Sequence, residues 1–307
     1  MEVEHKPSLN DPYYTTPKGC FYHGLSEEVL NDQLDLKGKV KLIFTSPPFP
    51  FDHPKKYGNF KGDEYIKWLS EFAPLFSDLL TSDGSIIIEI GNTWNRGSPT
   101  VSTIPIEAFL KFKEVGKLHL CQEFIRYTPD TLPRPSQWVC VERIRLKDAF
   151  TKLWWFSKTP WPDASNRRVL NEYTEQTKRR IKKGNYRMVV NGVKPRPPLK
   201  DNGGSIASDV IVADNSSSSK PYVKYCREHN IEKHPTRMAV DLVEFFIKFL
   251  TVDDDIVLDP FGGSNTTGAV AEKLNRRWVS IEPNEEYIKG SIGRFAEMGI
   301  EVEVFKN

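Results

Sequence analysis

Two short apolar segments flank one amphipathic segment near the start of the chain. KVKLIFTS at 39–46 and SIIIEIGN at 85–92 read as buried strands, and the residues between them, 64–80, have apolar side chains at helical spacing. The helical face consists of Ile66, Leu69, Phe72, Leu75, Phe76 and Leu79. Because a strand, a helix and a strand in this order form a parallel unit, the chain is restricted to α/β folds.

A second unit of this kind ends the chain. After HPTRM at 234–238, an apolar helical face is formed by Leu242, Phe245, Phe246 and Phe249. The elements predicted next are a strand at 256–260, a glycine-rich loop at 261–268, a helix at 269–277, a strand at 278–283 and a helix at 284–298. Between the two units the patterns predict a helix at 104–116 and strands at 118–128 and 148–159.

Regular patterns are missing between Pro160 and His234. This stretch is rich in proline, glycine, serine and charged residues, which is typical of a loop-rich insert. We therefore expect three parts. Residues 1–159 and 234–307 are the two halves of one α/β domain, and residues 160–233 are the inserted module.

Positive charge is concentrated in this insert. The whole chain has a formal net charge of +2, yet residues 166–200 contain 11 Lys and Arg against 2 Glu, with tyrosines interspersed. The run can be a solvated surface, or it can contact the phosphates of a nucleic acid. The candidate DNA-binding residues are Arg167, Arg168, Lys178, Arg179, Arg180, Lys182, Lys183 and Arg187.

Other features exclude whole classes of protein. No apolar stretch is long enough to cross a bilayer, and the N-terminal residues lack the pattern of a signal peptide, so we expect an intracellular protein. The four cysteines lie far apart with no C-x-x-C pair, so neither a zinc site nor a disulfide framework is predicted. No metal is expected.

The loop FGGSNTTG lies between a predicted strand and a predicted helix. Exposed backbone N–H groups at such a turn attract anions, and Gly262 and Gly263 allow close approach of a ligand. Glu282 ends the next strand 23 residues after Asp259, close to the spacing at which a carboxylate accepts hydrogen bonds from a ribose. The loop fits a nucleoside-bearing cofactor, although a plain strand-to-helix turn would look similar.

The segment TSPPF at 45–49 ends the first strand in a stiff corner. Two consecutive prolines remove two backbone donors, so the corner offers only acceptors. The Ser46 hydroxyl and the carbonyls of Ser46 and Pro47 can converge on an exocyclic amino group, and Phe49 can stack on an extruded base. Taken without its surroundings, the motif is also compatible with an ordinary turn that ends a strand.

TSPPF together with LDPFGGSNTTG resembles the DNA amino-methyltransferases that use S-adenosyl-L-methionine, and S-P-P-F is similar to their cytosine-N4 branch. The likeness extends over most of the chain, and the motif order is that of the permuted β group: catalytic motif, target-recognition region, cofactor loop. The resemblance implies a Rossmann-like α/β methyltransferase fold. Its sheet is expected to be mixed and mostly parallel, with seven strands and helices on both faces.

The resemblance also assigns roles to individual residues. Ser46, Pro47, Pro48 and Phe49 would hold and activate the cytosine amino group. Glu89 would help with its proton, or would simply satisfy backbone donors at the end of a strand. The residues implied to bind the cofactor are Asp259, Phe261, Gly262, Gly263, Ser264, Thr266, Thr267, Glu282 and His234.

One position departs from the family pattern. Leu25 stands where the family often has an aspartate that contacts the cofactor adenine, and a leucine cannot accept that hydrogen bond. Adenine recognition would then rely on apolar contacts and backbone groups, with Tyr22 or His23 as neighbouring candidates.

The resemblance implies that the partner is double-stranded DNA and that the protein acts on it as a monomer in the cytoplasm of a prokaryote. The methylation would protect this DNA against a separate restriction endonuclease. Three other functions stay open on the residues alone: adenine-N6 methylation, a nicotinamide-dependent oxidoreductase, and DNA binding without catalysis. The oxidoreductase gives no role to TSPPF or to the basic insert. Carbon-5 methylation is excluded, because no cysteine follows a proline.

Overall fold

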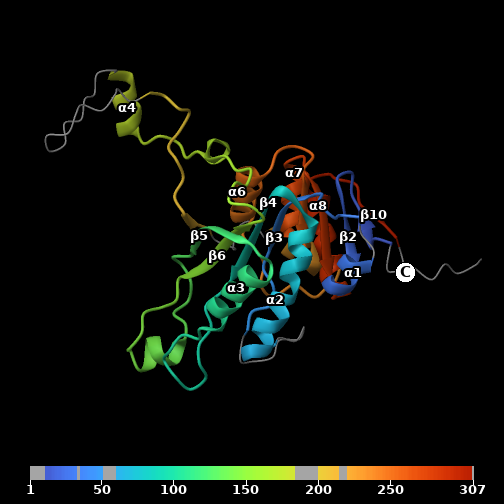
Figure 1. Ribbon diagram of the computed structural model, residues 1–307, viewed down its shortest axis with the longest axis horizontal. Helices are drawn as coiled ribbons and strands as arrows, with labels where there is room; N and C mark the ends of the chain where they lie inside the picture. Colours follow the sequence, from blue (N-terminus) through green and yellow to red (C-terminus); the bar gives the residue numbers. More distant parts are fainter. Residues whose placement is uncertain (1–10, 33–34, 51–59, 184–199, 214–219, 306–307) are drawn as a thin grey trace, which may run out of the picture.

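The computed structural model describes residues 11–32, 35–50, 60–183, 200–213 and 220–305. In this part of the chain one twisted sheet runs through the whole molecule, in the order β10-β1-β2-β9-β8-β3-β4-β6-β5-β7 (Figure 1). Its seven longer strands are β2 (Gly19–His23), β3 (Val40–Thr45), β4 (Leu80–Ile90), β5 (His119–Tyr127), β6 (Phe150–Ser157), β8 (Ile256–Asp259) and β9 (Arg277–Glu282). Three strands of two or three residues extend the sheet at its edges: β1 (Tyr14–Thr15), β7 (Val210–Val212) and β10 (Glu303–Val304).

The central strands are parallel, as the two strand-helix-strand units predict. Strands β2, β9, β8, β3 and β4 are paired in parallel, and β6 is antiparallel to both of its neighbours. The mixed, mostly parallel sheet is therefore confirmed, but in the described residues it has ten strands and not the predicted seven, because three short strands extend its edges. Parallel strands place their carboxyl ends at one edge, so the residues that follow β3, β4, β8 and β9 gather there.

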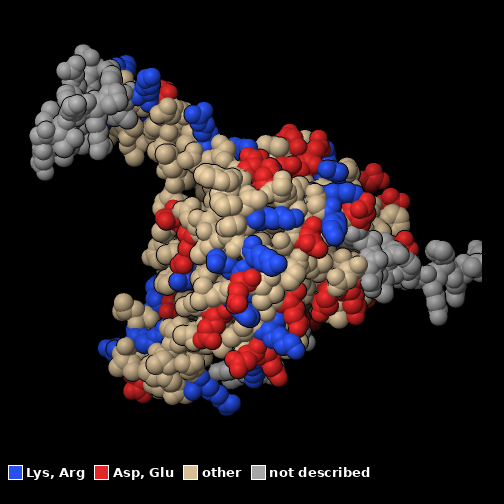
Figure 2. Space-filling view, viewed as in Figure 1, with Lys and Arg blue, Asp and Glu red and all other residues tan. Residues whose placement is uncertain are grey.

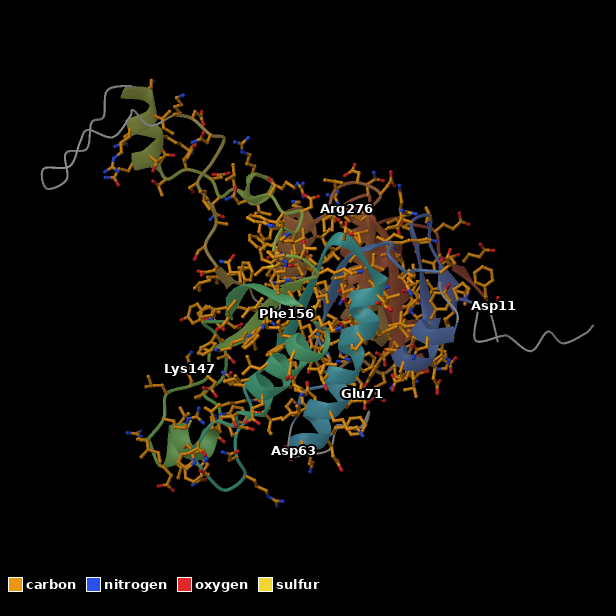
Figure 3. The ribbon with its side chains drawn as sticks, viewed as in Figure 1. Asp11, Asp63, Glu71, Lys147, Phe156 and Arg276 are labelled. Carbon is orange, nitrogen blue, oxygen red and sulfur yellow. The ribbon has the colours of Figure 1, made fainter. Side chains whose placement is uncertain are left out.

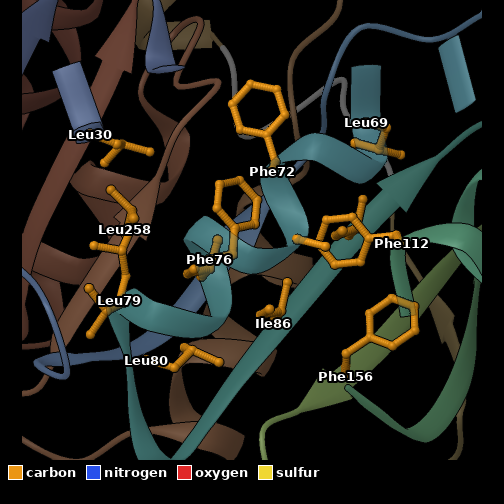
Figure 4. Close-up of a cluster of buried hydrophobic side chains, with 14 of the residues drawn as sticks. Leu30, Leu69, Phe72, Phe76, Leu79, Leu80, Ile86, Phe112, Phe156 and Leu258 are labelled. Atoms are coloured by element: carbon orange, nitrogen blue, oxygen red, sulfur yellow. The ribbon is translucent and has the colours of Figure 1, made fainter. Parts of the chain in front are cut away.

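Helices cover both faces of the sheet. One face is covered by α1 (Ser26–Asp32), α2 (Gly62–Leu79) and α3 (Ile104–Val115), and the other by α6 (Val240–Leu250), α7 (Thr266–Lys273) and α8 (Glu285–Glu297). Side chains alternate along β4: Ile86 and Ile88 pack beneath α2 and α3, and Ile87 packs beneath α6. The sheet therefore has a hydrophobic core on each face, and Figure 4 shows the core beneath α2 and α3. No helix in the described residues is long and apolar enough to span a membrane.

Two segments project from this core on the side of β5 and β6. One carries the 3₁₀ turn η2 (Asn166–Val169) and α4 (Glu175–Lys183), which lies far from the sheet (Figure 1). The other is the connection between β5 and β6, which contains a π-helical turn at Gln137–Val141. Two elements inside the range 160–233 belong to the core instead, because β7 pairs with β5, and α5 (Lys220–Glu228) packs against α8.

Candidate active site

A single cavity of about 870 Å³ brings the two predicted motifs together. Its wall contains Ser46, Pro47, Pro48, Phe49 and Glu89 from the first half of the chain. The second half contributes Asp259, Phe261, Gly262, Gly263, Ser264, Thr266, Thr267 and Glu282, together with His234 from the HPTRM segment. The five predicted catalytic residues therefore share one cavity with nine of the ten predicted cofactor residues.

The Asp259 carboxylate connects the two motifs. Its Oδ1 accepts hydrogen bonds from Thr45 Oγ1 at 2.7 Å and from the Phe261 N–H at 3.2 Å, and its Oδ2 accepts one from Thr267 Oγ1 at 2.6 Å. Burial raises the pKa of Asp259 to about 6, although these hydrogen bonds oppose the rise. Because Thr45 directly precedes Ser46, one side chain holds the end of β3 against the glycine-rich loop.

Glu282 supports the same loop from the end of β9. Its two carboxylate oxygens accept hydrogen bonds from the N–H groups of Gly263 and Asn284, each at 3.0 Å. Burial raises the pKa of Glu282 to about 7, against the effect of these two bonds. A carboxylate that lines the cavity here still has lone pairs with which to accept the hydroxyl groups of a ligand.

Ser264 is held from behind by a buried arginine. Arg294 donates from Nε to the Ser264 carbonyl at 2.6 Å and from Nη2 to its hydroxyl at 2.9 Å. The guanidinium lies 5.0 Å from the centre of the Tyr222 ring, and the Tyr222 hydroxyl accepts the His234 N–H at 2.9 Å. Helices α5 and α8 thereby position both the loop and the start of the HPTRM segment.

The loop is built to take a polar ligand. Gly263 has a φ of +50°, and a Cβ added there would lie 3.0 Å from His234 Nε2, so only glycine leaves this side of the backbone open. Thr266 Oγ1 is buried and has no hydrogen-bond partner among the described residues. A free hydroxyl donor beside backbone N–H groups suits a carboxylate, and Glu282 suits a ribose, so the residues fit S-adenosyl-L-methionine.

The serine-proline corner lies beside Glu89. Ser46 Oγ donates to the Glu89 backbone carbonyl at 3.2 Å, because β3 and β4 are paired in register up to Thr45 and Ile88. Glu89 is 3% exposed, and its side chain accepts hydrogen bonds from Arg126 at 3.0 Å and from Thr151 at 2.6 Å. Its carboxylate therefore binds two side chains and no strand-end backbone donor among the described residues.

Phe49 packs closely against the end of β4. The Phe49 ring lies so near Gly91 that a Cβ added to this glycine would be 2.6 Å from Phe49 Cε2. The ring also packs against the core beneath α2 and α3. The absence of a side chain at Gly91 thus allows the Phe49 ring to occupy its position in the cavity wall.

Tyr22 lies apart from the other predicted cofactor residues. It does not line the cavity; the residue is 8% exposed, and its ring packs in the core beneath α1 and α2, because its place in β2 turns it inward. Leu25 lines the cavity instead, as the expectation of apolar contacts requires, together with Ser26 and Glu27. His23 lies outside, where its Nε2 is 3.0 Å from the Pro283 carbonyl oxygen.

The predicted DNA-binding residues have different surroundings. The Arg168 guanidinium binds the backbone carbonyls of Phe249 and Thr251 and pairs with Asp163, which fastens the module to the end of α6. Lys178 pairs with Glu175 at an exposed position on α4. Arg167, Arg179 and Lys182 are exposed, Arg180 is half-buried, the side chain of Lys183 is not described, and Arg187 lies outside the described residues.

Several cavity residues were not predicted from the sequence. They come from the ends of β5 and β6 and from the connection between them: Arg126, Thr128, Thr131, Arg134, Asp148, Ala149, Phe150 and Thr151. The signal that could have found Arg126 is an arginine that follows two apolar residues in a predicted strand, FIR, because a buried charge needs a partner.

Comparison with known proteins agrees with this geometry. The family model described as DNA methylase, N6_N4_Mtase, matches residues 40–293. The chain belongs to the DNA methylase family. The family and its α/β methyltransferase fold, both predicted from TSPPF and the glycine-rich loop, are thereby confirmed.

Relatives of this DNA methylase include type II methyltransferases. It is 37% identical over 300 residues to the type II methyltransferase M.PvuII of Proteus hauseri, which covers 95% of this chain and 88% of that protein. The solved structure of PvuII DNA methyltransferase (cytosine-N4-specific) matches with a TM-score of 0.76 and 35% identity, over 92% of this chain and 88% of that one. The M1.HpyAVI–SAM complex shares the fold, with a TM-score of 0.55, 22% identity, and coverage of 90% and 98%.

Proposed function

We propose that this DNA methylase transfers a methyl group from S-adenosyl-L-methionine to N4 of a cytosine that has left the DNA duplex. One observation carries the proposal: the Ser46–Phe49 corner and the Asp259–Thr267 loop line the same cavity. The similarity to M.PvuII and to its cytosine-N4-specific structure supports N4 as the acceptor atom. Adenine-N6 methylation is the alternative, since the matching family model includes both kinds of enzyme by name.

The residues of the corner would act by position and by hydrogen bonding. The cofactor supplies an electrophilic methyl group on a positively charged sulfur. The cytosine amino group donates its protons to acceptors at Ser46, Pro47 and Glu89, which draws its lone pair out of the ring system and toward the methyl carbon. As the N4–C bond forms, the C–S bond breaks with its electrons remaining on sulfur, and N4 loses one proton to the Glu89 carboxylate or to water.

The Phe49 ring gives a further prediction. In the variant Gly91→Ala, the new Cβ would displace the ring, because it would otherwise lie 2.6 Å from Phe49 Cε2. Stacking on an aromatic ring contributes about 1–3 kcal/mol per base, so kcat/KM for DNA should fall about tenfold or more. Steady-state methylation assays test this. Phe49→Leu is the matched variant, and adding Gly91→Ala to it should cost little more; a Gly91→Ala enzyme with unchanged kcat/KM would contradict the prediction.

Cofactor binding should depend on pH through Glu282. Its pKa is raised to about 7, so the carboxyl group is ionised above that pH and neutral below it. If the ionised form accepts the ribose hydroxyls, the affinity for S-adenosylhomocysteine is highest above pH 7 and falls about 30-fold by pH 5.5, in proportion to the ionised fraction. Calorimetric titration at several pH values measures this. Glu282→Gln should bind more weakly at every pH and show little pH dependence, whereas a flat profile for the unmodified protein would contradict the assignment.

The projecting module is the proposed target-recognition region. Two backbone hydrogen bonds of 2.9 Å between Asn171 and Ser205 join the outgoing and returning segments of this module. Helix α4, which lies between these two residues in the sequence, carries Lys and Arg side chains. Figure 2 shows these basic side chains along the extension. Phosphate contacts by this surface would make DNA binding strongly salt-dependent. We propose that the enzyme acts as a monomer on duplex DNA in a prokaryotic cytoplasm and protects that DNA against a separate endonuclease.

The test is to identify the methylated base. The purified protein is incubated with unmethylated DNA and labelled S-adenosyl-L-methionine, and the nucleosides are then separated by mass. N4-methylcytosine is expected, and Ser46→Ala should form at least about 100-fold less of it, as expected when a group that positions the acceptor is removed. N6-methyladenine would replace the N4 assignment with the alternative. Absence of any methylated base, together with binding of a nicotinamide cofactor, would overturn the proposal.

A further inference from the structure

We propose that Arg126 is a positioning residue for methyl transfer. It holds the Glu89 carboxylate in the orientation that the target amino group needs, and it ties this carboxylate to the strand that returns from the recognition module. This inference rests on the proposed function, because it assigns Glu89 a role toward the amino group. Arg126 itself touches neither reacting atom and acts through Glu89.

The first observation is how the Glu89 carboxylate is held. Arg126 lies on β5, is 8% exposed, and donates from Nη1 to Glu89 Oε1 at 3.0 Å. Thr151 on β6 donates to the same oxygen at 2.6 Å. The hydrogen bonds of the described residues therefore occupy Oε1 and leave Oε2 for an incoming donor. All three residues line the cavity, so that donor can come from a ligand.

The second observation is what else the guanidinium binds. Its Nε donates to the Ala213 carbonyl at 3.3 Å, and the Thr128 hydroxyl donates to the same oxygen at 3.2 Å. Ala213 is 2% exposed and directly follows β7, the strand by which the chain returns from the recognition module. The planar Arg126 side chain thus links the Glu89 carboxylate to the end of β7.

The chemistry of arginine explains this choice of residue. A guanidinium presents donors in a fixed fork and can bind two acceptors in set directions, whereas a lysine ammonium is a single point of charge. A buried carboxylate that loses its cation must reorient or take up a proton. Either change would remove the acceptor aimed at the amino group, and a displacement of about 1 Å at such a group can lower the rate about 100-fold.

The experiment is a double-mutant cycle on the full chain. We expect Arg126→Gln to lower kcat about 100-fold while the dissociation constants of S-adenosylhomocysteine and DNA change less than about threefold, since the lost interaction acts on the acceptor geometry alone. Arg126→Lys should restore part of kcat, because it returns the charge but not the fork. In a Glu89→Gln background, Arg126→Gln should cost less than about a further threefold, because residues that act through one another are not additive.

Arg276→Gln is the matched control. Arg276 is also a buried arginine in an ion pair, 2.7 Å from Asp253, and it lies by α7, away from the β5–β6 connection on which Lys147 is labelled (Figure 3). Its loss should lower the melting temperature and leave kcat unchanged. The proposal is overturned if Arg126→Gln keeps kcat within about twofold, if it behaves like Arg276→Gln, or if its loss is undiminished in the Glu89→Gln background. The cycle uses whichever base the unmodified enzyme methylates, so a failure of the N4 assignment is seen separately.

Discussion

Replacing Asp259 by alanine is expected to lower methyl transfer at least about 100-fold, because the corner and the cofactor loop would lose the side chain that holds them together. The change leaves Thr45 Oγ1, Thr267 Oγ1 and the Phe261 N–H without their buried acceptor. Each such group costs about 1–3 kcal/mol when unsatisfied, and relief from burying the carboxylate offsets part of that cost. Single-turnover assays and denaturant unfolding measure the two effects.

The loss of stability should itself depend on pH. The pKa of Asp259 is raised from 3.8 to about 6 in the folded state, so its contribution to stability is fully present below pH 4 and is lost as the pH rises through 6. Asp259→Ala should therefore destabilise the protein more at pH 5 than at pH 7, by about 1 kcal/mol. Asp259→Asn keeps one acceptor and should have an intermediate effect. Equal activity of the alanine variant and the unmodified enzyme would contradict the bridging role.

Replacing Gly263 by alanine is expected to weaken cofactor binding by about 10- to 100-fold. Gly263 has a φ of +50°, where a residue with a side chain costs about 1–2 kcal/mol. The new Cβ would also lie 3.0 Å from His234 Nε2, and the His234 ring cannot retreat freely because it packs edge-on against the Tyr287 ring, with 4.6 Å between ring centres. Titration with S-adenosylhomocysteine measures the loss of affinity.

Gly299 provides the control for this change. Its φ is +66° and an added Cβ would meet nothing within 4 Å, so Gly299→Ala has the same backbone strain without the clash. We expect a similar loss of stability from both variants and a loss of cofactor affinity from Gly263→Ala alone. If the two variants bind the cofactor equally well, the contact between Gly263 and His234 does not shape the loop.

Most of the fold could be predicted from local patterns. Short apolar runs and apolar residues at helical spacing were sufficient to place β3, α2, β4 and α3, and the parallel order followed from their succession. The short edge strands were missed because two or three residues carry no periodic signal. Within the insert, β7 and α5 were missed because their role is to pack on β5 and α8, which nothing near them in the sequence reveals.

In the candidate site, too, some residues could be predicted from local sequence and others depended on tertiary packing. Ser46 to Phe49 and Asp259 to Thr267 could be named from the sequence, because each motif has a local conformation set by proline or glycine and each follows a strand. Tyr22 and Arg168 lie in surroundings that the sequence did not reveal: Tyr22 packs in the core, and Arg168 binds backbone carbonyls at the end of α6. Whether a side chain in a short strand or turn faces the core, a backbone carbonyl or solvent is decided by the segment that packs against it.

The sequence by itself determined the two strand-helix-strand units, the stiff corner and the glycine-rich loop, because all of these depend on the conformational preferences of neighbouring residues. Only the tertiary structure decided the partners of Glu89 and Asp259. Arg126 is 37 residues from Glu89, and Thr45 is 214 residues from Asp259. Contacts at such separations arise from the order in which strands assemble into the sheet, and hydrogen bonds between single side chains leave no periodic pattern in the chain.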